Sequence, residues 1–225
     1  TTKVKIEEPE RDEDERVELV SALAEDRDRV KAQAELDALR RKYEKDAPHA
    51  AFDTTFTKIV FGEGDPCARL CFVGEAPGED EDLTGRPFVG RAGQLLDKMI
   101  VAMGLKREQV YICNVLKTRP PGNRAPTAEE IAACKPYLLK QLAIVRPMAV
   151  VALGFSATNA LIESLEPIGK MRGRWWELED ATGRKIPLMP TYHPAFLLRS
   201  YTEENRRKVW SDLQMAMERV GLKKG

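Results

Sequence analysis

The chain has 225 residues, 43% of them hydrophobic, which fits one domain of about 150–170 residues plus an appendage better than two full domains. Its 36 basic and 36 acidic residues cancel, so the overall charge gives no support for nucleic-acid binding, although basic segments at 117–124 and 170–174 leave room for a local basic face. No apolar run reaches the roughly 18 residues of a membrane span, and no signal-peptide pattern is present.

The first 57 residues are predicted to form an extension outside the main domain. Residues 1–15 are polar and strongly acidic from 7 to 15, and we expect them to be disordered. Residues 16–45 read as one charged helix with a thin apolar stripe, and a proline-containing connector follows at 46–57. The stripe consists of Val17, Val20, Leu23, Val30, Leu36 and Leu39. We expect this helix to pack on the domain or to be partly free, with self-association or a protein partner bound through the stripe as the alternative.

From residue 58 to residue 225, short strands alternate with helices. Strands are predicted at 70–73, 110–116, 148–153, 174–178 and 185–189, and helices at 93–103, 127–145, 156–161 and 203–220. This alternation predicts an α/β fold: a three-layer α/β/α domain with a central, mostly parallel four-stranded sheet flanked by helices, to which the N-terminal helix is added. Ligands of such sheets bind at the C-terminal ends of the strands.

The most informative stretch, residues 72–96, begins where the first of these strands ends. It contains a glycine-rich turn at 74–78, an acidic cluster at 79–82 and a second turn that carries Phe88. Backbone N–H groups in such turns can face a ligand. The acidic cluster would repel a polyphosphate, and no Gly-Lys-Ser/Thr follows, so the loop favours a neutral or weakly polar group beside an aromatic ring. We interpret Asp80 and Asp82 as part of a solvated loop or as helix caps.

Two further blocks complete a set of three motifs. One runs from Tyr111 to Pro126 and combines YICNV with the basic, proline-containing KTRPPGNRAP, and the other is TYHPAFLLR at 191–199. Together with the segment at 72–96, they resemble the family 4 uracil-DNA glycosylases, a group that normally carries an iron–sulfur cluster. The resemblance covers about residues 58–213. Three motifs in order, with family-like spacing, make it specific, whereas any one of them alone would be a weak signal.

The resemblance implies uracil excision, a reaction that needs a flipped nucleotide, a reader of the uracil edge and a stabiliser of the departing base anion. Phe88 is expected to stack on the base, and the amide of Asn114 to match the O4 and N3–H edge. His193, in the His-Pro-Ala motif, is expected to donate from a neutral imidazole to uracil O2. Backbone N–H groups near Glu75 and Ala76 would help to hold the base.

The carboxylates of the first motif leave alternatives open. Ala76 stands where other uracil glycosylase families place an aspartate that positions water, so Glu75 and Glu81 become the candidates for orienting water or favouring the sugar cation. A purely structural role for Glu81 weighs about equally. Without the resemblance, Phe88 would be read as a core aromatic residue and Asn114 as a loop cap.

Basic and apolar side chains near these motifs are expected to contact DNA. A proline-stiffened basic loop can hold phosphates at low entropic cost, and an apolar wedge can fill the gap left by a flipped base. The predicted DNA-binding residues are Lys117, Arg119, Arg124, Arg172, Leu197, Leu198 and Arg199. Packing of one or both leucines in the core is the alternative.

The cysteines depart from the family pattern. The family binds its cluster through four cysteines, and alignment of the motifs puts Ala47, Ala50 and Thr118 at three of these positions, so that Cys134 alone matches. The other cysteines, at 67, 71 and 113, have poor cluster spacing or lie in apolar strand segments. We therefore expect no cofactor and no metal ligand. The insertion of a related covalently trapping branch is also absent.

These observations favour one function over two alternatives. The preferred function is a monofunctional uracil-DNA glycosylase that hydrolyses the N-glycosidic bond of flipped-out deoxyuridine during base excision repair, without a cluster. The first alternative is a catalytically inactive protein of the same fold that binds DNA or a repair partner, and the second is a nucleotide-processing enzyme or base-binding module. We expect uracil-containing DNA as the partner, a monomer, no membrane association, and a cytoplasmic, nucleoid-associated location, which the lack of disulfide spacing also favours.

Overall fold

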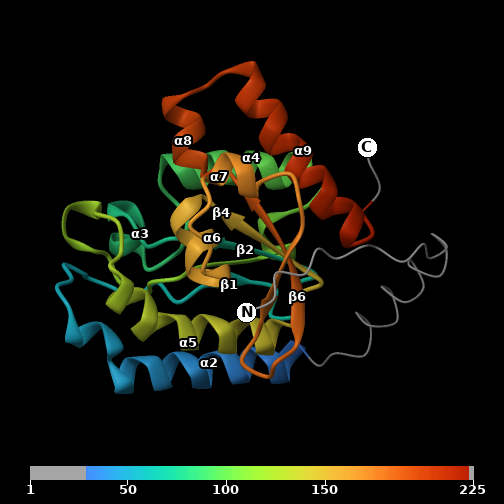
Figure 1. Cartoon of the computed structure of the whole chain (residues 1–225). Coiled ribbons are helices and arrows are strands. Elements are labelled where there is room, and N and C mark those ends of the chain that lie inside the picture. The colour runs from blue at the N-terminus through green and yellow to red at the C-terminus, as the bar shows by residue number, and fades with distance from the viewer. Residues whose placement is uncertain (1–28, 223–225) are drawn as a thin grey trace.

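Figure 1 shows the computed structural model of the protein, which describes residues 29–222. Its strands are β1 (Glu63–Gly64), β2 (Leu70–Gly74), β3 (Tyr111–Asn114), β4 (Ala149–Leu153), β5 (Trp176–Glu179) and β6 (Lys185–Thr191). Its α-helices are α2 (Arg29–Asp46), α3 (Glu79–Thr84), α4 (Arg91–Ala102), α5 (Ala128–Val145), α6 (Phe155–Ile162), α7 (Ile168–Met171), α8 (Pro194–Arg199) and α9 (Glu203–Arg219). Three 3-10 turns, η1 (Pro48–Ala51), η2 (Arg107–Gln109) and η3 (Pro121–Asn123), lie between them.

The strands form one sheet in the order β1-β3-β2-β4-β6-β5. The four central strands β3, β2, β4 and β6 run parallel, and helices supply the crossovers that parallel strands require. The α/β fold class and the parallel core of four strands are thereby confirmed. The antiparallel edge strands β1 and β5 extend this core to a mixed sheet of 6 strands.

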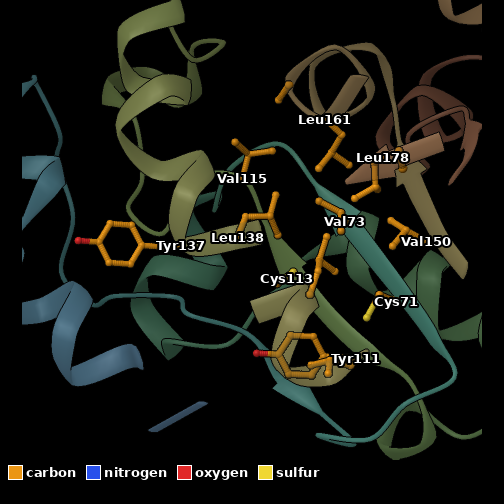
Figure 2. Close-up of a cluster of buried hydrophobic side chains, with 14 of the residues drawn as sticks. Cys71, Val73, Tyr111, Cys113, Val115, Tyr137, Leu138, Val150, Leu161 and Leu178 are labelled. Carbon is orange, nitrogen blue, oxygen red and sulfur yellow. The ribbon is translucent and has the colours of Figure 1, made fainter. Parts of the chain in front are cut away.

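Alternating side chains of the buried strands build a core on each face of the sheet. On β2, Cys71 and Val73 share a core with α5 and α6, whereas Leu70 and Phe72 share a core with α4 and α9. Figure 2 shows part of the first core, in which Val73 lies among side chains of neighbouring strands and of α5. Because both faces are covered, the strands read as continuous apolar runs in the sequence.

The helix α2 lies along α5, on the outer side of one helical layer (Figure 1). Leu36 and Leu39 of the predicted stripe are buried, whereas Val30 is exposed. Tyr43 is fully buried and packs edge-on against Tyr137 of α5, with the ring centroids 5.0 Å apart. The prediction that this helix packs on the domain is confirmed for its described part. The acidic tail and the start of the predicted helix, residues 1–28, lie outside the described residues.

The acidic cluster of the first motif forms the short helix α3, whereas the sequence indicates a solvated loop or helix caps for Asp80 and Asp82. Asp80 is exposed as interpreted, but the interpretation is wrong for Asp82, which is only 2% exposed. Its carboxylate accepts hydrogen bonds from the backbone N–H groups of Thr57 and Lys58, at 2.6 and 3.2 Å. Asp82 therefore fixes the end of the connector to the domain.

Candidate active site

A cavity of about 670 Å³ lies at the C-terminal ends of the four parallel strands. Its walls come from the turn after β2, the end of β3, the start of α6 after β4, and the segment after β6. The chain passes from β2 to β3 on one side and returns to β4 on the other, so β2 is a topological switch point, the usual ligand position in such sheets. The predicted site residues that line the cavity are Glu75, Ala76, Glu81, Phe88, Asn114, Arg124, His193 and Arg199.

The two glycine-rich turns of the first motif are joined by the carboxylate of Glu81. Its Oε1 accepts from the N–H groups of Val89 and Gly90, both at 2.8 Å, and its Oε2 accepts from the N–H of Gly78 at 3.1 Å. A carboxylate that holds three backbone donors fixes the shape of the loop. The geometry therefore favours the structural role for Glu81, while Glu75 lines the same cavity.

Phe88 lies beside His193 and, like Asn114, close to Gly74. Its ring is buried on the cavity wall, with its centroid 5.7 Å from that of His193. A Cβ atom built on Gly74 would lie 2.4 Å from the Phe88 ring and 2.3 Å from Oδ1 of Asn114. The absence of a side chain at Gly74 therefore lets the ring and the amide approach the end of β2 together.

Asn114 lines the cavity and carries a buried polar atom without a partner in the described part of the chain. The residue is 1% exposed, and its Oδ1 has no hydrogen-bond partner within residues 29–222. Buried polar atoms are nearly always paired, so this unpaired acceptor, on a residue of the cavity wall, is the candidate partner for a donor that a ligand brings. Parallel pairing of Asn114 with Gly74 fixes this amide beside the first turn.

His193 is held as a neutral ring with a defined donor. Its Nδ1 accepts a hydrogen bond from the N–H of Ala195 at 3.1 Å, so the proton of the neutral imidazole lies on Nε2. Burial, helped by the charge of Arg199 and opposed by Glu81, lowers the pKa of His193 to about 4. The ring is therefore a neutral hydrogen-bond donor at physiological pH.

This depressed pKa makes stability depend on pH. An unfolded chain protonates His193 near the ordinary pKa of about 6.5, whereas the folded chain does so only near pH 4. Between these values the unfolded state binds more protons, so the free energy of unfolding should fall as the pH falls through this window. Urea denaturation at about pH 7 and about pH 5 should show a smaller fall for His193→Asn than for the parent chain. Equal falls would contradict the depressed pKa.

The segment after β4 was not singled out from the sequence, although it forms one cavity wall. Gly154 has φ +90°, and a Cβ there would lie 3.0 Å from Cβ of His193. Phe155, which follows it, lines the cavity and is 41% exposed. The available signal was an apolar strand that ends in glycine, the same pattern that marked Gly74.

The structure corrects the prediction that Lys117 contacts DNA. Lys117 is 0% exposed, and its Nζ donates to the backbone oxygen of Asn114 at 2.6 Å and to Oε1 of Gln141 at 2.5 Å. Burial lowers the pKa of this amine. Because the ammonium group lies inside the core, it cannot reach a phosphate. Its hydrogen bond to the backbone oxygen of Asn114 instead stabilises the end of β3.

Two other predicted DNA contacts are also corrected. Leu197 is 2% exposed and belongs to the core with α4 and α9, so it is not a wedge. Arg172 donates to both oxygens of the buried Asp212, at 2.9 and 2.7 Å, and its side chain is only 14% exposed. Leu198 and Arg199, by contrast, are exposed at the end of α8.

The basic loop at 117–126 keeps two arginines close to the cavity. Arg124 lines the cavity and donates to both oxygens of Glu130, at 2.8 and 2.6 Å. Arg119 donates from Nε to Oδ1 of Asn123 at 2.8 Å, and Asn123 also lines the cavity. These contacts order the loop at the rim.

Comparison with known proteins decides the family. A family model described as the uracil DNA glycosylase superfamily matches residues 61–214, which include every residue that lines the cavity. The chain belongs to the uracil-DNA glycosylase superfamily. It is therefore a DNA glycosylase, a DNA-repair enzyme with DNA as its substrate. No described helix of this glycosylase is long and apolar enough to cross a membrane.

Curated relatives place the glycosylase beside the type-4 group. It is 48% identical to a type-4 uracil-DNA glycosylase of Thermotoga maritima over 161 residues, which cover 71% of this chain and 82% of that relative. A type-4 enzyme of Archaeoglobus fulgidus is 44% identical over 173 residues, which cover 75% of this chain and 85% of that relative. A type-5 enzyme of Pyrobaculum aerophilum is 35% identical over 147 residues, which cover 59% of this chain and 63% of that relative. The family 4 resemblance is confirmed.

The same comparisons contradict the expectation that this glycosylase has no cofactor. Its relatives are named type-4 enzymes, the group for which the resemblance implied an iron–sulfur cluster, so membership points to a cluster. Of the four ligand positions, Ala47, Ala50 and Thr118 offer no thiol, and Cys134 is buried with its pKa raised by burial. In residues 29–222, no three His, Cys, Asp or Glu side chains are grouped to hold a metal ion. These residues do not match a four-thiolate site, and no step below passes through a cluster.

Proposed function

We propose that the protein is a monofunctional uracil-DNA glycosylase that takes a flipped deoxyuridine into the cavity between Phe88, Asn114 and His193. The observation that carries this proposal is the unpaired, buried Oδ1 of Asn114 on the cavity wall, as far as residues 29–222 show. Uracil brings a donor to it, the N3–H group, whereas cytosine has an acceptor at N3 and would leave Oδ1 unpaired. The relatives' names support uracil-DNA glycosylase activity.

The chemistry begins with cleavage of the bond between C1′ of the sugar and N1 of uracil. The electron pair leaves with the base, whose negative charge extends to O2, and the sugar gains oxocarbenium character. Nε2–H of the neutral His193 donates to O2 and stabilises this charge, with Phe88 stacked on the ring. Water then adds to C1′, oriented by the carboxylate of Glu75, which receives its proton, and N1 is protonated from solvent.

The residues around the cavity support hydrolysis without strand cleavage. No lysine is among the described residues that line it. The nearest candidate by sequence, Lys117, is enclosed in the core with its Nζ on Asn114 and Gln141. Among residues 29–222, the cavity wall therefore supplies no amine to form an imine to C1′, the intermediate that leads to strand cleavage.

The DNA-facing side of the proposal rests on the residues that remain exposed. Leu198 is 38% exposed, next to Arg199, on the helix that follows His193, where a wedge can replace the stacking of the flipped base. Arg124 lines the cavity and Arg119 donates to its lining residue Asn123, and we assign both to contacts with backbone phosphates. In this proposal residues 58–225 form the glycosylase domain, and the enzyme acts as a monomer on nucleoid DNA.

Asn114→Asp tests the reading of uracil. A carboxylate offers no donor to O4 and repels the departing base anion, so the single-turnover rate of uracil release should fall by about 100-fold or more. The measurement uses a single-stranded oligonucleotide with one uracil, cleaved at the abasic site by alkali. Gln94→Glu, which adds the same charge on an exposed residue of α4 outside the cavity, should keep nearly the full rate.

The outcomes separate this function from the first alternative. Release by the parent and by Gln94→Glu, with loss in Asn114→Asp, supports a glycosylase that reads uracil through this amide. A parent chain that binds the oligonucleotide and releases no base would instead favour a DNA-binding protein of the same fold. Equal rates for parent and Asn114→Asp would show that another group reads the base.

A further inference from the structure

The turn that carries Phe88 is held from behind by a residue outside the cavity. Arg107, the first residue of η2, donates from Nη1 to the backbone oxygen of Phe88 at 3.2 Å and from Nη2 to the backbone oxygen of Pro87. The same guanidinium donates to Oε1 of Glu63 at 2.7 Å and to Oδ1 of Asp97 at 2.6 Å. Its side chain is 14% exposed and lies outside the residues that line the cavity.

The backbone at Phe88 needs such support. Its φ of +51° lies in the left-handed region, which an aromatic residue rarely adopts. On one side of the turn, the backbone oxygens accept hydrogen bonds from Arg107. On the other side, the N–H groups of Val89 and Gly90 donate to Glu81. A cation and a carboxylate thus fix opposite polar faces of one turn, and the ring direction follows from this turn.

The backbone at the start of α4 leaves this turn little room to adopt another conformation. A Cβ on Gly93 would lie 1.9 Å from the backbone oxygen of Phe88, so the start of α4 already touches the turn. The oxygen that meets Gly93 is the same one that accepts from Arg107. Without the guanidinium, this carbonyl would lose a charged partner in a place with little room for water.

Arginine suits this position better than lysine. A guanidinium carries five N–H donors in a fixed planar fork, and Arg107 uses three of its nitrogens on four different acceptors. Burial raises the pKa of Glu63, but hydrogen bonds from Arg86 and Arg107 outweigh this effect and hold the pKa below its ordinary value. The carboxylate that accepts from Arg107 therefore stays charged. A lysine could keep an ion pair with Glu63 or Asp97 but could not also reach both backbone oxygens.

We propose that Arg107 is a positioning residue of the glycosylase: it fixes the turn at Pro87 and Phe88 so that the ring of Phe88 faces the uracil. This inference rests on the proposed function, because it assigns Arg107 an effect through the stacking ring. It extends the site beyond the cavity wall to a residue that touches neither base nor sugar.

The test is a double-mutant cycle on uracil release, with Arg107→Gln, Phe88→Ala and the pair. Arg107→Gln should lower the single-turnover rate by roughly 10- to 100-fold and weaken inhibition by free uracil, with affinity for uracil-free DNA unchanged. The double variant should be no slower than Phe88→Ala, because Arg107 acts through that ring. Arg86→Gln is the matched control: the guanidinium of Arg86 also holds Glu63 but donates to neither Pro87 nor Phe88 in the described structure, and the rate of this variant should stay near that of the parent.

Arg107→Lys keeps the inference testable should the glutamine variant fail to fold. Lysine retains the charge beside Glu63 and Asp97, so its melting temperature should stay close to that of the parent while the slow rate persists. Restoration of the full rate by lysine, or losses from Arg107→Gln and Phe88→Ala that simply add, would overturn the positioning role and leave the proposed function standing. A parent chain that releases no uracil would overturn both.

Discussion

His193→Ala should lower the rate of uracil release by about 100- to 1,000-fold, the usual cost of removing one preorganised donor to a developing anion. The structure gives the reason: Nδ1 accepts from the N–H of Ala195, which leaves the proton on Nε2, and burial lowers the pKa to about 4, so the ring is a neutral donor at working pH. Affinity for DNA should change by no more than a few-fold, because in the proposed mechanism the ring contacts the base and not the DNA backbone. Single-turnover release and fluorescence anisotropy with uracil-free DNA measure the two quantities.

The other histidine of the chain provides the control. His49 is buried between Tyr43 and Phe56, with ring centroids 5.4 and 4.8 Å away, and it lies outside the residues that line the cavity. His49→Ala should lower the melting temperature while the folded protein keeps its rate. A His193→Ala variant that turns over as fast as the parent would remove this residue from the mechanism.

Gly74→Ala should abolish most of the activity of a chain that still folds. The added Cβ would lie 2.3 Å from Oδ1 of Asn114 and 2.4 Å from the Phe88 ring, so both side chains must move. Displacements of this size cost about 100-fold in rate, whereas overpacking costs about 1–3 kcal/mol of stability. Uracil release per folded molecule, with urea denaturation alongside, separates the two effects.

Gly169→Ala is the comparison for this substitution. It adds the same methyl group in α7, where the nearest contact is the hydroxyl oxygen of Tyr192 at 3.4 Å. This variant should keep both its rate and its stability near those of the parent. If Gly74→Ala were equally active, the close approach of ring and amide to the end of β2 would not matter for the reaction.

Residues that a local pattern defines were predictable from the sequence. Apolar runs that end in Gly74 and Gly154 located strand ends, and Thr127 marked the start of α5, where its side chain accepts from the N–H of Glu130. Asn114 ends β3 and His193 follows β6, so a parallel sheet brings both to one cavity. Phe88 lies beyond α3, and its place at the site came from the family resemblance.

Residues whose surroundings depend on distant partners were not predictable. Lys117 and Arg172 read as surface cations because nothing local shows that Gln141 and Asp212 will meet them. Leu197 is buried and Leu198 exposed on the same short helix, a difference set only by how α8 rests on α4. The edge strand β1 has two residues, too few to show the alternation of apolar and polar residues that predicts a strand.

The switch point at β2 has a consequence for how the enzyme is assembled. Cys71 of β2 pairs with Tyr111 on one side and with Val150 on the other, so its neighbours must arrive from far along the chain. Such non-local pairing slows folding, because the entropy of closing the loops is lost before the stabilising contacts form. The walls of the cavity follow different strands, and His193 follows β6, the last of these strands along the chain. A nascent or partly unfolded chain therefore has no base-binding cavity, and excision is confined to molecules that have completed the sheet.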